Sequence, residues 1–393
     1  MRKTVAIFAL TLASAVFAAD ADAFNDGVDR SDPNFVKASL VVASPGGELF
    51  SCVGHNAIRL ECEKFDLDYC FSYESESAKD RLAAYFAGHL KMGMFAVPTA
   101  DYLKPYADEG RGVRQYPMNL SPSVKQRLWK LLDEKVAEGS ELPYDYEKRG
   151  CSKSTWEVLR AAIGDSPLDL SAWRPLKTTQ RERVSETIAS THPWTLFALH
   201  AIGGTGVDHV EQVVVPPDLL AIIRAARIGG VPIIDSEGTD LLPVARKDIA
   251  SVMTPWIAAW VLLLCGVAFF CKVGFLRKPI TAVVLFVQAV FGAFLTFLVL
   301  CSSLPATTWN WLIVPFNLLP LIFWKWRRRW ALAFAGVLTV WEAGMLLSPH
   351  QLTDPAYLVI VLAYIVFYLK IALQGKCLRS APKTADREEG GRV

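Results

Sequence analysis

The residue best suited to act as a nucleophile is Cys151, which follows the helix breaker Gly150. Apolar residues at helical spacing come after it: Val158, Leu159, Ala162 and Ile163. This pattern predicts that Cys151 begins a helix. The helix dipole and the free backbone N–H groups at such a position stabilise a thiolate and could hold an oxyanion. A buried, unreactive cysteine is the alternative interpretation.

A general base for this thiol could come from His55, far earlier in the chain. Two β-rich apolar runs flank a glycine turn at residues 46–47, and the second run carries His55 directly after Gly54. A lone strand histidine is most often structural. Together with a helix-start cysteine, however, it has the composition of a papain-like thiol enzyme, and the reversed order fits a circularly permuted version. The nearer Cys52 would face away from His55 on a straight strand, so Cys151 is favoured.

A third residue could orient the imidazole. Asp68, Tyr73 and Glu48 are close to His55 in the sequence, and Asp68 is preferred because a carboxylate can fix the tautomer of the ring. The alternative for Asp68 is a solvated turn residue. Candidates for substrate contact or for support of the site are Ser51, Arg59, Tyr73, Arg111, Tyr144 and Asn310. Asn310 lies in apolar surroundings, where a polar side chain is either functional or a partner in helix-to-helix hydrogen bonding.

The second half of the chain resembles a membrane domain. The protein has 393 residues, of which 52% are hydrophobic, and the excess is concentrated in residues 254–375. A bilayer core of ~30 Å needs ~20 apolar residues per helix. Five predicted spans come close to this length: 256–275, 280–300, 309–324, 330–347 and 356–373. The third is short and carries Pro315, Asn317 and Pro320, so it could be kinked or partly re-entrant.

The flanking charges orient these spans. Lysine and arginine residues follow the first, third and fifth spans, and the loops after the second and fourth carry neither. The positive-inside rule then places residues 20–250 outside the inner membrane. The chain also begins with Arg2, Lys3, an apolar run and small residues at Ala18 and Ala19, the pattern of a signal peptide, or alternatively of an uncleaved anchor.

We therefore expect four parts: a signal peptide over 1–19, a catalytic periplasmic domain over 20–250, a transmembrane domain over 251–375 and a cytoplasmic tail over 376–393. The formal net charge of +2 gives no reason to expect a nucleic-acid partner. The four cysteines of the outer domain are Cys52, Cys62, Cys70 and Cys151.

Cys62 and Cys70 flank a polar stretch that could be a hairpin turn, so an oxidising compartment makes a bridge between them plausible. Spacing alone does not decide the pairing. A less favoured alternative is a zinc site built from Cys52, His55, Cys62 and Cys70.

Several segments resemble the family of periplasmic domains named after Lnb, which is similar to permuted papain-like enzymes. The matching segments are residues 45–59, 110–113 with 119–121, 144–155, 199–220 and 309–320. The resemblance covers most of residues 38–324. It implies an α+β permuted papain-like periplasmic domain followed by an all-α bundle of about five transmembrane helices.

The resemblance further implies a membrane-bound lipoprotein N-acyltransferase with Cys151 as nucleophile and His55 as general base. It would need no cofactor or metal, and its partners would be a membrane phospholipid acyl donor, a diacylated lipoprotein acceptor and the bilayer. Two departures are Gly150, where the family pattern has Asn or Asp, and the cysteine at position 52. The alternatives are a periplasmic cysteine peptidase or amidase acting on cell-wall peptides, and a non-catalytic membrane-anchored binding module.

Overall fold

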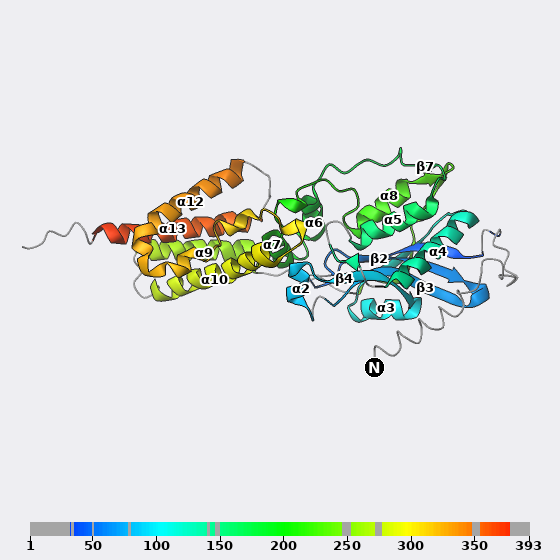
Figure 1. Cartoon of the computed structure of the whole chain (residues 1–393), viewed down its shortest axis with the longest axis horizontal. Helices are drawn as coiled ribbons and strands as arrows, with labels where there is room; N and C mark the ends of the chain where they lie inside the picture. The colour runs from blue at the N-terminus through cyan, green and yellow to red at the C-terminus, as the bar shows by residue number, and fades with distance from the viewer. Residues whose placement is uncertain are drawn as a thin grey trace, which may run out of the picture.

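The computed structural model describes residues 32, 35–48, 51–77, 80–139, 142–145, 150–245, 253–271, 277–347 and 354–377. A mixed α+β region occupies one end of the elongated molecule, and a helical bundle occupies the other (Figure 1). The predicted succession of an α+β part and an all-helical part is therefore confirmed. The predicted signal peptide and cytoplasmic tail lie outside the described residues, apart from the two at the end of the last helix.

A seven-stranded sheet forms the centre of the α+β region, in the order β10-β5-β1-β2-β3-β4-β6 with antiparallel pairing throughout. Its strands are β1 (Lys37–Ala43), β2 (His55–Cys62), β3 (Leu67–Ser75), β4 (Lys91–Pro98), β5 (Val113–Pro117), β6 (Leu142–Pro143) and β10 (Thr239–Leu242). Successive side chains of a strand point to opposite faces, and both faces of this sheet are covered by helices. One face of the sheet is apolar along most of its strands, whereas the other mixes apolar residues such as Val41 with polar ones such as Arg59 and Asp68.

One face of the sheet packs against helices α4 (Pro122–Glu138), α5 (Cys151–Ile163) and α8 (Pro216–Ala225), which together form the main core. The other face packs against α3 (Thr99–Asp108). Smaller elements complete the region: α2 (Leu82–Ala87), α6 (Gln180–Ile188), α7 (Pro193–Ile202) and a three-stranded sheet of β7 (Leu168–Asp169), β8 (Arg227–Ile228) and β9 (Val231–Pro232).

The β2–β3 hairpin corrects the disulfide prediction. Cys62 pairs with Leu67 across the turn, and Cys70 lies three residues further along β3. Cys62 is buried in the main core, whereas Cys70 is buried on the opposite face beside Tyr102 and Tyr106. Both are free thiols, because strand alternation directs them to opposite sides of the sheet.

The bundle contains α9 (Pro255–Phe270), α10 (Arg277–Cys301), α12 (Arg327–Leu347) and α13 (Pro355–Cys377). Within the described residues, three helical stretches are long and apolar enough to cross a membrane: Lys278–Cys301, Trp324–Leu347 and Pro355–Leu373. Helix α9 is apolar but has only 16 residues.

The predicted third span is not a continuous helix. Residues 309–326 form only short turns, namely η5 (Trp311–Ile313), α11 (Leu319–Ile322) and η6 (Trp324–Trp326). Pro315 and Pro320 lack the N–H groups that a continuous helix requires. Gln288 of α10 donates instead to the carbonyls of Pro315, at 3.0 Å, and Asn317, at 2.6 Å. The expectation of five helical spans is therefore wrong for this segment.

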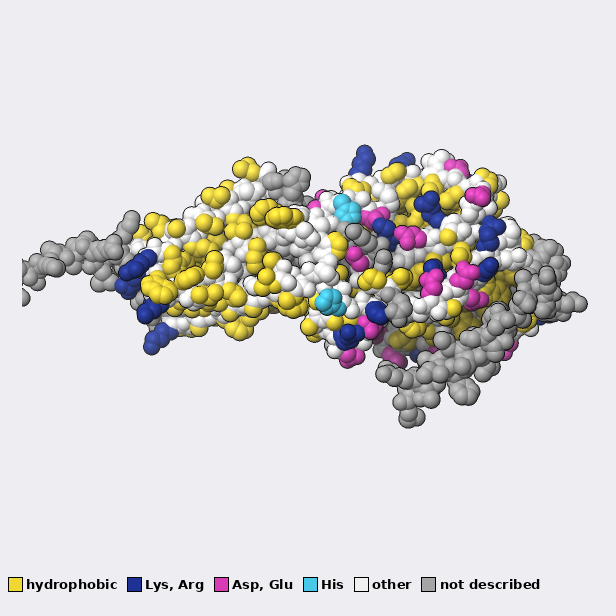
Figure 2. All heavy atoms as spheres, viewed as in Figure 1, with side chains coloured by type: hydrophobic (Ala, Val, Ile, Leu, Met, Phe, Trp, Pro, Cys, Tyr) yellow, Lys and Arg dark blue, Asp and Glu magenta, His cyan; other side chains and the backbone are white. Residues whose placement is uncertain are grey.

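Figure 2 shows that Lys and Arg side chains gather at the end of the bundle that is farthest from the α+β region, while its flanks are hydrophobic. Lys278 lies near the start of α10, and Arg327, Arg328 and Arg329 open α12. This distribution agrees with the positive-inside rule if the α+β region is on the outer side of the membrane.

Candidate functional site

His55 and Glu74 form the first pair of the site. His55 is the first residue of β2, and the β2–β3 register, in which Ile58 pairs with Phe71, continues to place His55 opposite Glu74. The imidazole Nε2 lies 3.1 Å from Glu74 Oε1. Ser72 Oγ donates to the same carboxylate oxygen at 2.8 Å. Glu74 thus orients the His55 imidazole, and Ser72 in turn orients the Glu74 carboxylate.

Gly54 allows β2 to begin where it does. Its φ of +91° lies in the region that favours glycine, and a Cβ there would come within 2.7 Å of the Ala43 carbonyl oxygen. A larger residue would push the strand away from β1. Gly54 therefore sets the position from which His55 projects.

Cys151 is the first residue of α5, as predicted, and follows Gly150 in extended conformation. Helix α5 packs on the main-core face of the sheet. Asn56, the neighbour of His55, donates from Nδ2 to Cys151 Sγ at 3.5 Å and to Ser152 Oγ at 2.9 Å. The fold thus brings Cys151 to the end of β2, where the His55 imidazole is near enough to lower the pKa of the thiol.

The three side chains change one another's ionisation. Burial opposes the thiolate, but the charge and hydrogen bond of His55, together with a hydrogen bond from Ser152, hold the pKa of Cys151 below its usual value. Burial likewise opposes the imidazolium, yet Tyr106, Glu74 and Cys151 raise the pKa of His55 well above its usual value. Both directions favour a thiolate–imidazolium pair over a neutral thiol and a neutral imidazole.

Glu74 remains ionised beside this pair. The partial burial of Glu74 would raise the pKa of its carboxyl, but the charge of His55, hydrogen bonds from His55 and Ser72, and the charge of Arg111 lower it. A carboxylate, an imidazolium and a thiolate in sequence are the charge arrangement that activates a sulfur nucleophile.

A cavity of about 150 Å³ lies beside the histidine and is lined by Ser51, Gly54, His55, Glu74, Tyr106 and Arg111. The Arg111 guanidinium donates to the Ser44 carbonyl at 2.8 Å and stacks 4.7 Å from the centroid of the Tyr106 ring. Two of the predicted contact residues, Ser51 and Arg111, therefore do lie at the site.

Asp68 does not lie at the site, so its predicted role is corrected. It forms two hydrogen bonds of 2.8 Å with Arg59 and accepts a third from Thr99 at 2.6 Å. Six residues of extended strand, roughly 20 Å, separate it from Glu74. Arg59 also bonds Gln115 and pairs with Glu61, so both predicted residues tie strands together at the far end of the hairpin.

Three other predicted residues are also structural in this arrangement. Tyr73 is buried in the main core on the face opposite Glu74, and burial raises its pKa to about 12. Tyr144 stacks on Tyr85 with ring centroids 6.1 Å apart. Asn310 is buried and donates to the Ala201 carbonyl at 2.7 Å, while its own oxygen accepts from the Leu312 backbone at 3.0 Å.

The alternative cysteine sites are not assembled. Cys52 is buried with Ile188 and Leu196, and burial raises its pKa to about 11, which keeps it protonated. Cys52, Cys62 and Cys70 belong to three different clusters. Among the described residues, no group of three His, Cys, Asp or Glu side chains is close enough to hold a metal ion.

The end of the sheet that carries His55 faces the helical bundle. The residues just before β2, Cys52 and Val53, pack on α6 and α7. Helix α7 packs in turn on the bundle: the Phe197 ring stacks on Tyr357 of α13 at 4.2 Å, and the Tyr357 hydroxyl donates to the Phe197 carbonyl at 2.8 Å. A short series of contacts therefore links the Cys151–His55 pair to the bundle.

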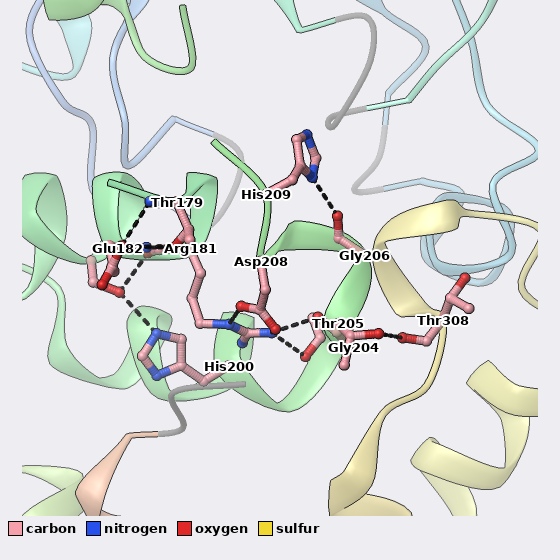
Figure 3. Close-up of polar contacts among 12 residues, drawn as sticks. Thr179, Arg181, Glu182, His200, Gly204, Thr205, Gly206, Asp208, His209 and Thr308 are labelled. Atoms are coloured by element: carbon pink, nitrogen blue, oxygen red, sulfur yellow. Dashed lines mark hydrogen bonds and ion pairs between the residues drawn. The ribbon is translucent and has the colours of Figure 1, made fainter. Parts of the chain in front are cut away.

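Backbone pairing joins the two regions directly. The Gly204 N–H donates to the Ala306 carbonyl at 2.7 Å, and the Thr205 N–H donates to the Thr308 carbonyl at 2.9 Å. Figure 3 shows Arg181 pointing into the turn that presents these groups, where it pairs with Asp208 at 2.6 Å and donates to the Gly204 carbonyl. The junction is thus held by a buried ion pair and by main-chain hydrogen bonds.

A larger cleft of about 550 Å³ lies elsewhere, between α5, α8 and the segments around Trp173 and Gln212. It is lined by Lys153, Trp156 and Arg160 of α5 among others, and neither Cys151 nor His55 lines it. We therefore place the candidate site at the smaller cavity, which is lined by His55 and Glu74.

Together, these features describe a membrane protein whose α+β domain holds a cysteine, a histidine and a glutamate together on the side facing its helical bundle. Residues 24–182 match the family model of the Lnb N-terminal periplasmic domain, which indicates a periplasmic domain of this type in that part of the chain. The match includes His55, Glu74 and Cys151. No curated protein and no solved structure matches the chain.

Proposed function

We propose that the protein is a lipoprotein N-acyltransferase that carries a fatty acyl chain on Cys151. The observation that carries this proposal is the Cys151–His55–Glu74 arrangement at the end of the sheet that faces the membrane bundle. A reactive thiol placed at that end can meet substrates that are themselves anchored in the outer leaflet. Tethering enzyme and substrates to one surface raises their effective concentration.

In the first half-reaction, the Cys151 thiolate attacks an ester carbonyl carbon of a membrane phospholipid. A C–S bond forms, the ester C–O bond breaks, and the His55 imidazolium gives its proton to the leaving alkoxide. The products are a thioester on Cys151 and a lysophospholipid. The backbone N–H groups at the start of α5 are the donors available for the oxyanion of the intermediate.

In the second half-reaction, the neutral α-amine of a diacylglyceryl-cysteine at a lipoprotein N-terminus attacks the thioester. A C–N bond forms and the C–S bond breaks. His55, now neutral, takes the proton that the nitrogen loses, so the thiolate–imidazolium pair is restored. Dividing the transfer through a covalent intermediate replaces one difficult step by two easier ones.

The fold supports a papain-like interpretation of this chemistry. As in that class, a helix-start cysteine packs against an antiparallel sheet that supplies the histidine. Here the histidine strand precedes the cysteine helix in the chain, which is the order of a circularly permuted version. Glu74 takes the part of the orienting residue that we had predicted for Asp68.

Mass spectrometry provides the test. The full-length protein in phospholipid nanodiscs is expected to gain the mass of one acyl chain on Cys151, and an added diacylated lipoprotein is expected to receive that chain on its N-terminal amine. Cys151→Ser and His55→Gln should form no thioester. Cys271→Ser, which changes an exposed cysteine at the end of α9, is the matched control and should retain the adduct.

A cellular comparison separates the proposal from hydrolysis of wall peptides. Deletion of the gene should remove the N-linked acyl chain from lipoproteins and leave wall peptides unchanged. Lipoproteins that keep every N-acyl chain, together with altered wall peptides, would contradict the proposal. Full complementation by Cys151→Ser would point to a non-catalytic role.

A further inference from the structure

Asn56 contacts the sulfur that the proposed chemistry uses. Its side-chain amide nitrogen lies 3.5 Å from Cys151 Sγ and 2.9 Å from Ser152 Oγ. The two N–H bonds of this amide can therefore be directed to two acceptors at once. A distance of 3.5 Å is within hydrogen-bonding range for a sulfur acceptor, and a thiolate accepts more strongly than a thiol.

The surroundings of Asn56 enclose its side chain completely. Its side chain is completely buried, and Ser152 is 1% exposed. The Oδ1 atom is buried and has no hydrogen-bond partner within the described part of the chain. Turning the amide over would place this oxygen toward the sulfur, where it would repel a thiolate. Leaving a buried carbonyl oxygen unpaired is unfavourable, so the contacts made by the amide nitrogen must offset that cost.

Strand geometry explains why this residue and His55 act on the same atom. Neighbouring residues of a strand point to opposite faces, so His55 and Asn56 project to the two sides of β2. Cys151 lies at the start of a helix that packs on the Asn56 side, at the end of the strand where His55 can reach it as well. The sulfur is thus held between an acid–base group and a neutral donor.

We propose that Asn56 is a catalytic residue that donates a hydrogen bond to the Cys151 thiolate, with Ser152 anchoring its amide. This inference rests on the proposed role of Cys151 as nucleophile. The bond stabilises the sulfur in its charged form and fixes its direction before it attacks. It is a fixed donor, in contrast to His55, which loses and regains its proton in each cycle.

The test measures the pH dependence of Cys151 alkylation by iodoacetamide, read by peptide mass spectrometry on the full-length protein. Because only the thiolate reacts, the midpoint of the profile reports the pKa of the thiol. Ser152→Ala is compared with the double variant Asn56→Leu/Ser152→Ala. The double variant replaces both hydrogen-bonding partners by apolar groups and so leaves neither of them unpaired.

Adding Asn56→Leu to Ser152→Ala should raise the midpoint by about one pH unit, which is a tenfold smaller thiolate fraction below the midpoint. Cys52 and Cys70, whose pKa values are raised to about 11 by burial, serve as internal references and should not shift. Asn56→Asp, which keeps the shape and reverses the electrostatics, should raise the midpoint further.

An equal midpoint in Ser152→Ala and in the double variant, with unchanged reference cysteines, would overturn the inference and leave Asn56 a purely structural residue. The measurement needs only the thiol and no acyl donor. A shifted midpoint in a protein that never forms a thioester would therefore contradict the proposed function while supporting the role of Asn56.

Discussion

His55 and Glu74 face one another across the β2–β3 hairpin, with Nε2 and Oε1 3.1 Å apart. The exposed fractions of their side chains are 17% and 45%, so the histidine is the better shielded of the two. The carboxylate lies on the side of the imidazole where it can fix the ring and stabilise its charged form. Glu74 thus occupies the position of the orienting residue in the proposed Cys151–His55 mechanism.

Glu74→Gln should lower the rate of acyl transfer by about 10- to 100-fold, since it keeps the hydrogen bond but removes the charge. The carboxylate helps to raise the pKa of His55, so its loss lowers that pKa. The imidazolium would then lose its proton at a lower pH, and the alkaline limb of the rate–pH profile should move to lower pH. An unchanged alkaline limb would show that Glu74 does not act through the histidine.

Asp68→Asn is the matched comparison and should affect stability rather than catalysis. Asp68 pairs with Arg59 through two hydrogen bonds, and this pairing lowers its pKa. Because the carboxylate is 46% exposed, solvent screening limits the pair to roughly 1 kcal/mol of unfolding free energy.

A carboxyl whose pKa is lowered on folding contributes stability above its unfolded pKa of about 3.9 and loses it as the pH falls through the folded value. The difference in thermal midpoint between wild type and Asp68→Asn should therefore be full at pH 7 and shrink below pH ~4. If Asp68→Asn unfolded like wild type but lost acyl transfer, Asp68 would have a role in the site after all.

The contrast between Glu74 and Asp68 shows how much of the candidate site can be predicted from the sequence. The helix start at Cys151 and the strand at His55 follow from local patterns, and their pairing was expected from the composition of thiol enzymes. Proximity in sequence favoured Asp68 over Glu74, whereas proximity in a hairpin depends on the register. The turn that follows Cys62 sets a register in which His55 lies opposite Glu74. Predicting Glu74 from the sequence would have required that register.

Two other errors have similar physical origins. The expectation of a Cys62–Cys70 bridge left out the alternation of strand faces. Four turn residues lie between the two strands, so these cysteines, eight positions apart, point to opposite faces of the sheet. The third apolar span met the expected hydrophobicity but not the hydrogen-bonding requirement of a helix, because of its prolines. Contacts such as Asn56 with Cys151 depend on packing between distant elements and leave no local pattern.

Gly204→Ala should weaken the junction between the α+β domain and the bundle. A Cβ at this position would lie 2.0 Å from the Thr308 carbonyl oxygen, so the paired backbones would have to separate. Overpacking of this kind costs about 1–3 kcal/mol. We expect a lower thermal midpoint and a lower rate of acyl transfer from lipid substrates.

Gly336→Ala is the control for this junction variant. A Cβ on Gly336 of α12 meets nothing within 4 Å among the described residues. This change should therefore leave the thermal midpoint and the rate of acyl transfer near wild type. Equal behaviour of the two alanine variants would show that the close approach of Gly204 to Thr308 does not matter for the junction.

Gln288→Leu should destabilise the bundle, because Gln288 bonds two carbonyls in the interrupted third apolar segment. It is completely buried, and its amide donates to the carbonyls of Pro315 and Asn317. An apolar replacement leaves these two carbonyls without this donor in surroundings that contain little water, and each unpaired group costs at least 1 kcal/mol.

The thermal midpoint of Gln288→Leu in detergent should therefore fall by several degrees. Phe286→Leu, at a position 69% exposed on the same helix, is the control and should change the midpoint little. Equal midpoints for the two variants would mean that the segment is held by its apolar contacts alone.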